Sequence, residues 1–258
     1  MPQIQKILFP TSCSENSKKA FAYTLAMAKY FGCSVDVLYV CKPNVDLLVP
    51  SVMRYNLLQE EKHNAEKKLE QWIKEFEVHN LEIHQEVEMG YAKEMIAIYA
   101  NKRQDIDLIV MGTNDAYSLR KIIWGTIVSE TIESANAPVL VVPKGIVFQD
   151  IKNIAYVTPP SEHWRSVYPQ VEGLATDFSA QLYITHLPQA KYEVRAGEEH
   201  RVLEDYASAL HSFVYNTNLQ LLVTIEAVRS TLTRIFKYSK AQKMALKATI
   251  PLLVLKKK

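Results

Sequence analysis

The sequence has no apolar run that approaches the ~18 residues a membrane-spanning helix requires. Its first residues, MPQIQKILFP, also lack the basic start, long apolar stretch and small-residue cleavage site of a secretory signal. Of its 258 residues, 48% are hydrophobic and 22% are charged, which is typical of a soluble globular protein. We therefore expect a cytoplasmic protein without a membrane segment.

Cysteine is scarce, and its three positions, Cys13, Cys33 and Cys41, leave one thiol unpaired under any disulfide scheme. The seven histidines are scattered without the spacing of zinc ligands, so we expect no metal site. Cys13 follows an apolar strand and precedes a helix, where a helix dipole can activate a thiol. A redox-sensing thiol and a packed, unreactive one both remain open. The packed thiol is favoured, because no other cysteine or histidine is near in sequence.

The chain also lacks recognisable catalytic machinery. No nucleophile elbow is present, and no paired carboxylates stand on one helix face. We expect no catalytic residues, and the sequence favours a non-enzymatic role while leaving catalysis open.

Charge is balanced overall, at a net +2, but it is unevenly placed. From Arg229 to Lys258 the chain carries nine Lys or Arg and no Asp or Glu. Lys240, Lys243 and Lys247 are spaced to share one helix face. A solvated face is the favoured interpretation. Docking of an anionic partner is the alternative, and nucleic acid is not expected as that partner.

The chain repeats one pattern twice. The segment DLIVMGTNDAYSLRKIIWGTIVSETIESANAPVLVV, from Asp107, aligns without a gap to QLLVTIEAVRSTLTRIFKYSKAQKMALKATIPLLVL, from Gln220. KILFPT at Lys6 likewise resembles NIAYVT at Asn153. Only the first copy has a long helical pattern at residues 54–79, so one helix has been lost from the second copy.

Continuously apolar strands alternate with helices in both copies, which is typical of parallel sheets covered on both faces. We expect an α/β fold of two doubly wound parallel-sheet domains in tandem. The first would span residues 1–146, and the second, shortened by one helix, residues 150–258. Ligands of such sheets bind outside the carboxyl ends of the strands, where the strand order reverses.

A loop at one of these strand ends has features of a phosphate site. In GTNDAYSLRKIIWGT, residues 112–126, Gly112 and Gly125 permit a close backbone approach, and Thr126 stands at a helix start that attracts anions. Taken alone, the two glycines favour a structural turn and helix cap. Asp115, in the middle of the loop, would repel a phosphate.

Four segments raise the odds of a ligand site, because they follow the order of a known family. The series of strand, glycine loop, Gly-(Ser/Thr), helix and APVLVV resembles the ATP-binding signature of the universal stress protein family. KILFPTSCSENSKKAF resembles that family's first strand and helix, and VEMGYAKEMI its third strand. The resemblance covers the first copy and, more faintly, the second. It implies a tandem universal stress protein with an adenine nucleotide alpha hydrolase-like fold.

The resemblance also implies a nucleotide site with ATP and Mg²⁺ as candidate ligands. Ser12 stands where the family commonly has an aspartate, and Asp115 replaces the family's second glycine. A carboxylate about 4 Å from a phosphate costs roughly 1 kcal/mol in water and about 4 kcal/mol at an effective dielectric of 20. We therefore expect a weakened site, at Pro10, Thr11, Ser12, Val40, Gly112, Thr113, Asp115, Arg120, Gly125 and Thr126.

The second copy has lost more of the signature, since Ile225 and Tyr238 align with Gly112 and Gly125. We expect no nucleotide there. Because the family pairs its last strands between subunits, APVLVV and IPLLVL are expected to associate within the chain as a pseudo-dimer, and a homodimer stays open. The favoured hypothesis is a stress-response regulatory module with an unknown protein partner and weak or lost nucleotide binding. The alternative is a protein that binds ATP in its first domain and hydrolyses it slowly.

Overall fold

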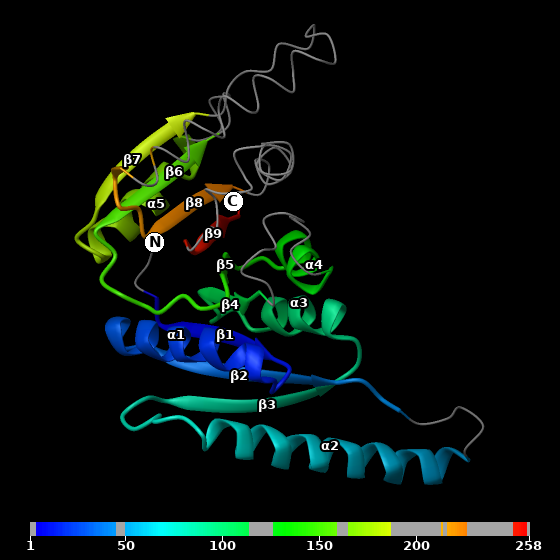
Figure 1. Cartoon of the computed structure of the whole chain (residues 1–258). Helices are drawn as coiled ribbons and strands as arrows, with labels where there is room; N and C mark the ends of the chain where they lie inside the picture. Colours follow the sequence, from blue (N-terminus) through cyan, green and yellow to red (C-terminus); the bar gives the residue numbers. More distant parts are fainter. Residues whose placement is uncertain are drawn as a thin grey trace, which may run out of the picture.

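The computed structural model describes residues 4–44, 50–113, 126–158, 165–186, 213, 216–225 and 250–256. These residues form one nine-stranded sheet with helices on both faces (Figure 1). The elements up to the middle of the chain are β1 (Lys6–Thr11), α1 (Glu15–Phe31), β2 (Ser34–Cys41), α2 (Ser51–Ile73), β3 (Ile83–Met89), α3 (Ala92–Lys102), β4 (Leu108–Gly112), α4 (Thr126–Ser134) and β5 (Val139–Val142). Those that follow are β6 (Asn153–Thr158), α5 (Tyr168–Asp177), β7 (Gln181–His186), β8 (Leu221–Ile225) and β9 (Leu252–Leu255).

The first half is a doubly wound parallel sheet in the order β3-β2-β1-β4-β5. The chain moves outward from β1 to β3 and then returns to β4 on the other side of β1. Right-handed crossovers therefore place α1 and α2 on one face and α3 and α4 on the opposite face (Figure 1). The expected α/β class with a mostly parallel sheet is confirmed.

The long helix expected at residues 54–79 exists, but both of its ends are earlier in the sequence. α2 runs from Ser51 to Ile73. Phe76, which had suggested a longer helix, lies beyond the helix end and packs edge-on against Phe21 of α1, with ring centroids 4.8 Å apart. An apolar residue in the turn thus continues the helical pattern without helical backbone. No helix in the described ranges combines the length and apolar character needed to cross a membrane.

The second half repeats the strand order of the first. β7-β6-β8-β9 follows the same order as β2-β1-β4-β5, and all four strands are parallel to one another. The residues aligned with the third strand of the first copy lie outside the described residues. The two aligned segments of the sequence therefore occupy equivalent positions in the sheet.

The two halves meet at their closing strands. β5 pairs antiparallel with β9, with Val139 opposite Val254, Leu140 opposite Leu253 and Val141 opposite Leu252. The expected pairing of APVLVV with IPLLVL is confirmed. Because this pair is antiparallel, the carboxyl edge of the second half lies on the same side as the amino edge of the first.

Side chains of the α1 face form one hydrophobic core that extends through both halves. Phe178, after α5, lies 5.4 Å from Tyr30 and 5.0 Å from Phe31 of α1, between ring centroids. In the connection between β5 and β6, Phe148 packs edge-on against Tyr23 at 5.3 Å, and Ile151 is buried. The connection is therefore part of the core. The division into domains at 1–146 and 150–258 stays a prediction.

We expect Leu253→Ala to destabilise the whole described sheet, because Leu253 is 3% exposed and lies opposite Leu140 in the β5–β9 pairing that joins the halves. Removal of a buried leucine side chain costs about 2–5 kcal/mol. Urea unfolding followed by circular dichroism measures this loss. The control is Val147→Ala, a residue that is 78% exposed and should change the free energy of unfolding by less than about 0.5 kcal/mol. Equal losses of unfolding free energy in the two variants would contradict a stabilising role for the β5–β9 pairing.

Candidate functional site

The strand order of the first half reverses between β1 and β4, which defines the ligand edge of a doubly wound sheet. β1 pairs with β4 in a register that places Leu8 opposite Ile109. Continued to the ends of the strands, this register brings Thr11 level with Gly112. Thr11 also lies opposite Tyr39 of β2. The structure thus gathers at this edge the described residues of the predicted site, which are Pro10, Thr11, Ser12, Val40, Gly112 and Thr113.

The loop after β1 is a turn rich in hydroxyl groups. Cys13 takes a left-handed backbone conformation, with φ of 55°, and its N–H donates to Thr11 Oγ1 at 3.0 Å. Ser12 is exposed, and its Oγ lies 2.9 Å from Ser14 Oγ. Ser14 precedes α1, and its N–H donates to Ser17 Oγ at 3.1 Å. The N-terminus of α1 therefore opens at the same edge as Ser12.

Gly112 has a packing role that the sequence did not reveal. A Cβ atom placed on Gly112 would lie 2.6 Å from Cβ of Ala20 in α1, which is far inside van der Waals contact. Thr113 continues the sheet, since its N–H donates to the carbonyl of Val142 at 3.1 Å. The glycine at the end of β4 thus permits α1 to lie close to the sheet, whether or not a ligand also approaches it.

The remaining predicted site residues are only partly described. Asp115, Arg120 and Gly125 lie outside the described residues. Thr126 is the first residue of α4, so the helix that was expected to face the ligand does begin at that position.

A cation that the sequence analysis missed lies near the carboxyl edge. Lys68 of α2 donates from Nζ to the hydroxyl of Tyr39 at 3.1 Å and lies 4.8 Å from the centre of the Tyr39 ring. The hydrogen bond with Tyr39 raises the pKa of Lys68. No sequence pattern links the two residues, because their proximity depends on how α2 packs against β2.

The environment of Cys13 favours a packed thiol over a reactive one. Burial raises the pKa of Cys13 from its ordinary 9.0 to about 11, even though Lys68 acts in the opposite direction. A reactive cysteine needs a low pKa, because the thiolate is the nucleophile. The hydrogen bond between Cys13 and Thr11 also lowers the pKa, but burial is the larger effect.

An ion pair between a buried carboxylate and a partly exposed arginine lies in the first half, away from this edge. Asp36 of β2 is fully buried and accepts hydrogen bonds from Arg103 Nη2 at 3.0 Å and from the Tyr99 hydroxyl at 3.2 Å. Arg103 also lies 3.5 Å from Asp105. Burial raises the pKa of Tyr99, so its hydroxyl stays a donor to the carboxylate. The network joins β2 to the end of α3 and is a structural feature.

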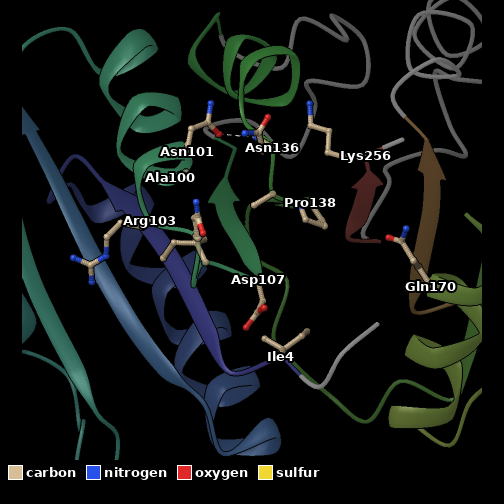
Figure 2. Close-up of a pocket in the computed structure, with 12 residues that line it drawn as sticks. Ile4, Ala100, Asn101, Arg103, Asp107, Asn136, Pro138, Gln170 and Lys256 are labelled. Atoms are coloured by element: carbon tan, nitrogen blue, oxygen red, sulfur yellow. Dashed lines mark hydrogen bonds between the residues drawn. The ribbon is translucent and has the colours of Figure 1, made fainter. Parts of the chain in front are cut away.

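A pocket of about 340 Å³ lies at the opposite, amino edge of the first half (Figure 2). Its wall includes Asp107 and Pro138, which precede β4 and β5, together with Gln170 of α5 and Lys256 after β9. It therefore spans the junction between the halves. Asp107 accepts hydrogen bonds from the N–H groups of Gln5 and Lys6 at 2.8 and 3.0 Å, so its carboxylate stabilises the start of β1. This pocket is distinct from the predicted nucleotide site.

Comparison with known proteins gives a consistent result. The sequence model of the Universal stress protein family matches residues 3–143. Universal stress protein MJ0531 of Methanocaldococcus jannaschii is 33% identical over 144 residues, which are 54% of this chain and 82% of that protein. Universal stress protein MJ0577 of the same organism is 28% identical over 155 residues, or 54% of this chain and 95% of that protein.

Several solved structures resemble nearly the whole chain. The crystal structure of a universal stress protein from Archaeoglobus fulgidus has a TM-score of 0.67 and 17% identity, over 99% of this chain and 97% of that one. At this identity the likeness concerns the fold alone.

We expect Gly112→Ala to destabilise the protein by about 1–3 kcal/mol, because the new methyl group overlaps Ala20. The matched variant is Ala20→Gly, which removes the opposing methyl group. The double variant should recover part of the loss, although a glycine within α1 itself costs about 1 kcal/mol. A double-mutant cycle on unfolding free energies measures the coupling. Strictly additive effects would show that the two positions do not touch.

We expect Cys13 to react slowly with iodoacetamide in the folded protein. With a pKa near 11 the thiol stays protonated at pH 8.5, and its thiolate fraction rises only as the pH approaches 11. Alkylation followed by mass spectrometry should be at least about tenfold slower than in the urea-unfolded chain. Equal rates in the two states would restore the redox-sensing interpretation.

Proposed function

This chain belongs to the universal stress protein family, and from that premise we propose that it is a stress-response binding module with a weakened nucleotide site in its first half. The ligand of that site is ATP with Mg²⁺. The module acts in the cytoplasm through a protein partner rather than by catalysis. The second half pairs with the first within the chain, in the place that a second subunit would take.

One observation carries the nucleotide part of the proposal. Thr11, Ser12 and Val40 converge with Gly112 and Thr113 at the edge where the strand order reverses. The N-terminus of α1 opens there, and α4 begins at Thr126. Exposed backbone N–H groups at helix starts favour the negative charge of a phosphate. Asp115 and Ser12 are the reasons for a weakened site, since one adds an anion and the other replaces the family's aspartate.

The second half is proposed to be a degenerate, shortened domain of the same family, paired with the first as a pseudo-dimer. Its repeated strand order and the likeness to the A. fulgidus fold support this proposal. Ile225, which aligns with Gly112, is 3% exposed at the end of β8. A β-branched side chain at that position prevents the close backbone approach that a phosphate needs. We therefore assign no nucleotide to the second half.

The alternative is a site of full affinity that also hydrolyses ATP slowly. Release of inorganic phosphate from Mg-ATP by the full chain distinguishes the two functions. Phosphate release that disappears in Thr126→Val would favour the alternative.

We expect millimolar Mg-ATP to raise the melting temperature of the full chain. Ligand at 100 times its dissociation constant stabilises a protein by about 2.7 kcal/mol. Asp115→Gly should increase the affinity by between about 5-fold and 10³-fold, the range of the repulsion between a carboxylate and a phosphate at 4 Å. Isothermal titration calorimetry gives the dissociation constants.

Asp115→Asn is the matched control, because it removes the charge and keeps the size of the side chain. If charge is the cause, Asn and Gly should improve binding alike. The absence of Mg-ATP binding in the wild type and in both variants would refute the nucleotide site.

A further inference from the structure

A lysine of the second half forms a hydrogen bond with a helix of the first half. Lys256 follows β9, and its Nζ donates to the main-chain carbonyl of Ile132 in α4. In a continuous helix the N–H of Asn136 would donate to that carbonyl. Here the N–H of Asn136 instead donates to Asn101 Oδ1 of α3 at 2.8 Å (Figure 2). Lys256 thus satisfies a carbonyl at the end of the helix that the main chain leaves without its usual donor.

The last turn of α4 is held from two sides. On one side, Asn101 accepts from Asn136 and donates from Nδ2 to the carbonyl of Ser134 at 2.9 Å. On the other, Val254 of β9 is fully buried in the same hydrophobic cluster as Ile132. A cation is also favourable at a helix C-terminus, where the helix dipole is negative. α3 therefore fixes one side of the last turn of α4, and the end of β9 fixes the other.

α4 connects this contact to the proposed ligand site. The helix begins at Thr126 and ends at Ser134. A helix this short behaves as a rigid rod of about 1.5 Å per residue, so a shift at one end moves the other. Lys256 is thus a polar contact by which the second half reaches the helix that starts at Thr126.

We propose that Lys256 is a positioning residue for the nucleotide site of the first half, acting through the Ile132 carbonyl and α4. The proposal rests on the proposed function. The first half cannot make the equivalent contact with the second, because the position aligned with Lys256 in the first half is Pro143, which has no cation. The half that lost its own signature would thus support the site that the other half keeps.

The test compares Lys256→Met with the wild type in the full chain. Met keeps the length of the side chain and removes its charge and donors. We expect the dissociation constant for Mg-ATP to rise about two- to fivefold, the range expected for a charge at a helix terminus. Lys256→Arg, which restores a cation and donors, should recover the affinity. Lys152→Met is the surface control, since the Lys152 side chain is 59% exposed and pairs with Asp150.

Hydrogen exchange provides a readout that does not depend on the nucleotide. Amide groups of α4 should exchange faster in Lys256→Met, while those of β1 and β2 stay as in the wild type. If α4 amides exchange faster but the dissociation constant for Mg-ATP is unchanged, Lys256 only stabilises α4, and the positioning role is overturned. Unchanged exchange and affinity would also overturn it.

A wild type that binds no Mg-ATP would remove the proposed function and, with it, the positioning role. In that case faster exchange in Lys256→Met would still show that Lys256 holds α4. The two failures are therefore distinguishable. A melting curve of each variant establishes that all measurements are made on folded protein.

Discussion

The antiparallel pairing of β5 with β9 is the contact on which the rest of the structure depends. Three residue pairs form it, and four of the six side chains, Val139, Leu140, Leu253 and Val254, are at most 3% exposed. A small α/β unit of four or five described strands would expose an apolar edge if it stood alone, and edges of this kind favour association. Pairing of the closing strands removes that edge from both halves at once. It also allows one hydrophobic core to continue from α1 to α5.

The direction of this pairing decides which surfaces meet. In the antiparallel arrangement the end of β9 lies beside the start of β5, so Lys256 reaches the last turn of α4. The proposed ligand edge of the first half lies at the opposite ends of the same strands, on the same side as the amino edge of the second half. A parallel pairing would have brought the carboxyl edges of both halves to the same side. The amino edge of the first half therefore carries the Lys256 contact with the second half, and its carboxyl edge is the proposed ligand edge.

Residues in this fold can have a packing reason and a ligand reason at once. Gly112 was predicted as part of a nucleotide site from the family resemblance, yet the contact with Ala20 alone would require a glycine there. Its presence is therefore weaker support for a nucleotide than the sequence pattern implied. Cys13 illustrates the converse case. Its position near a helix start suggested reactivity, but burial has the larger effect on its pKa. The burial of this thiol depends on tertiary packing and is not visible along the chain.

The sequence by itself determined the α/β class, the strands, the repeated strand order and the pairing of the closing strands. The class, the strands and the repeat follow from local apolar runs and from internal similarity, both of which are visible along the chain. The pairing of the closing strands was expected only from the family resemblance. The tertiary structure alone decided the overlap of Gly112 with Ala20, the Asp36–Arg103 ion pair, the Lys68–Tyr39 contact and the hold of Lys256 on α4. Each joins residues on different elements, and no periodicity encodes such a distance. Even the C-terminal end of α2 depended on packing, because a turn places Phe76 against Phe21 as a helix would.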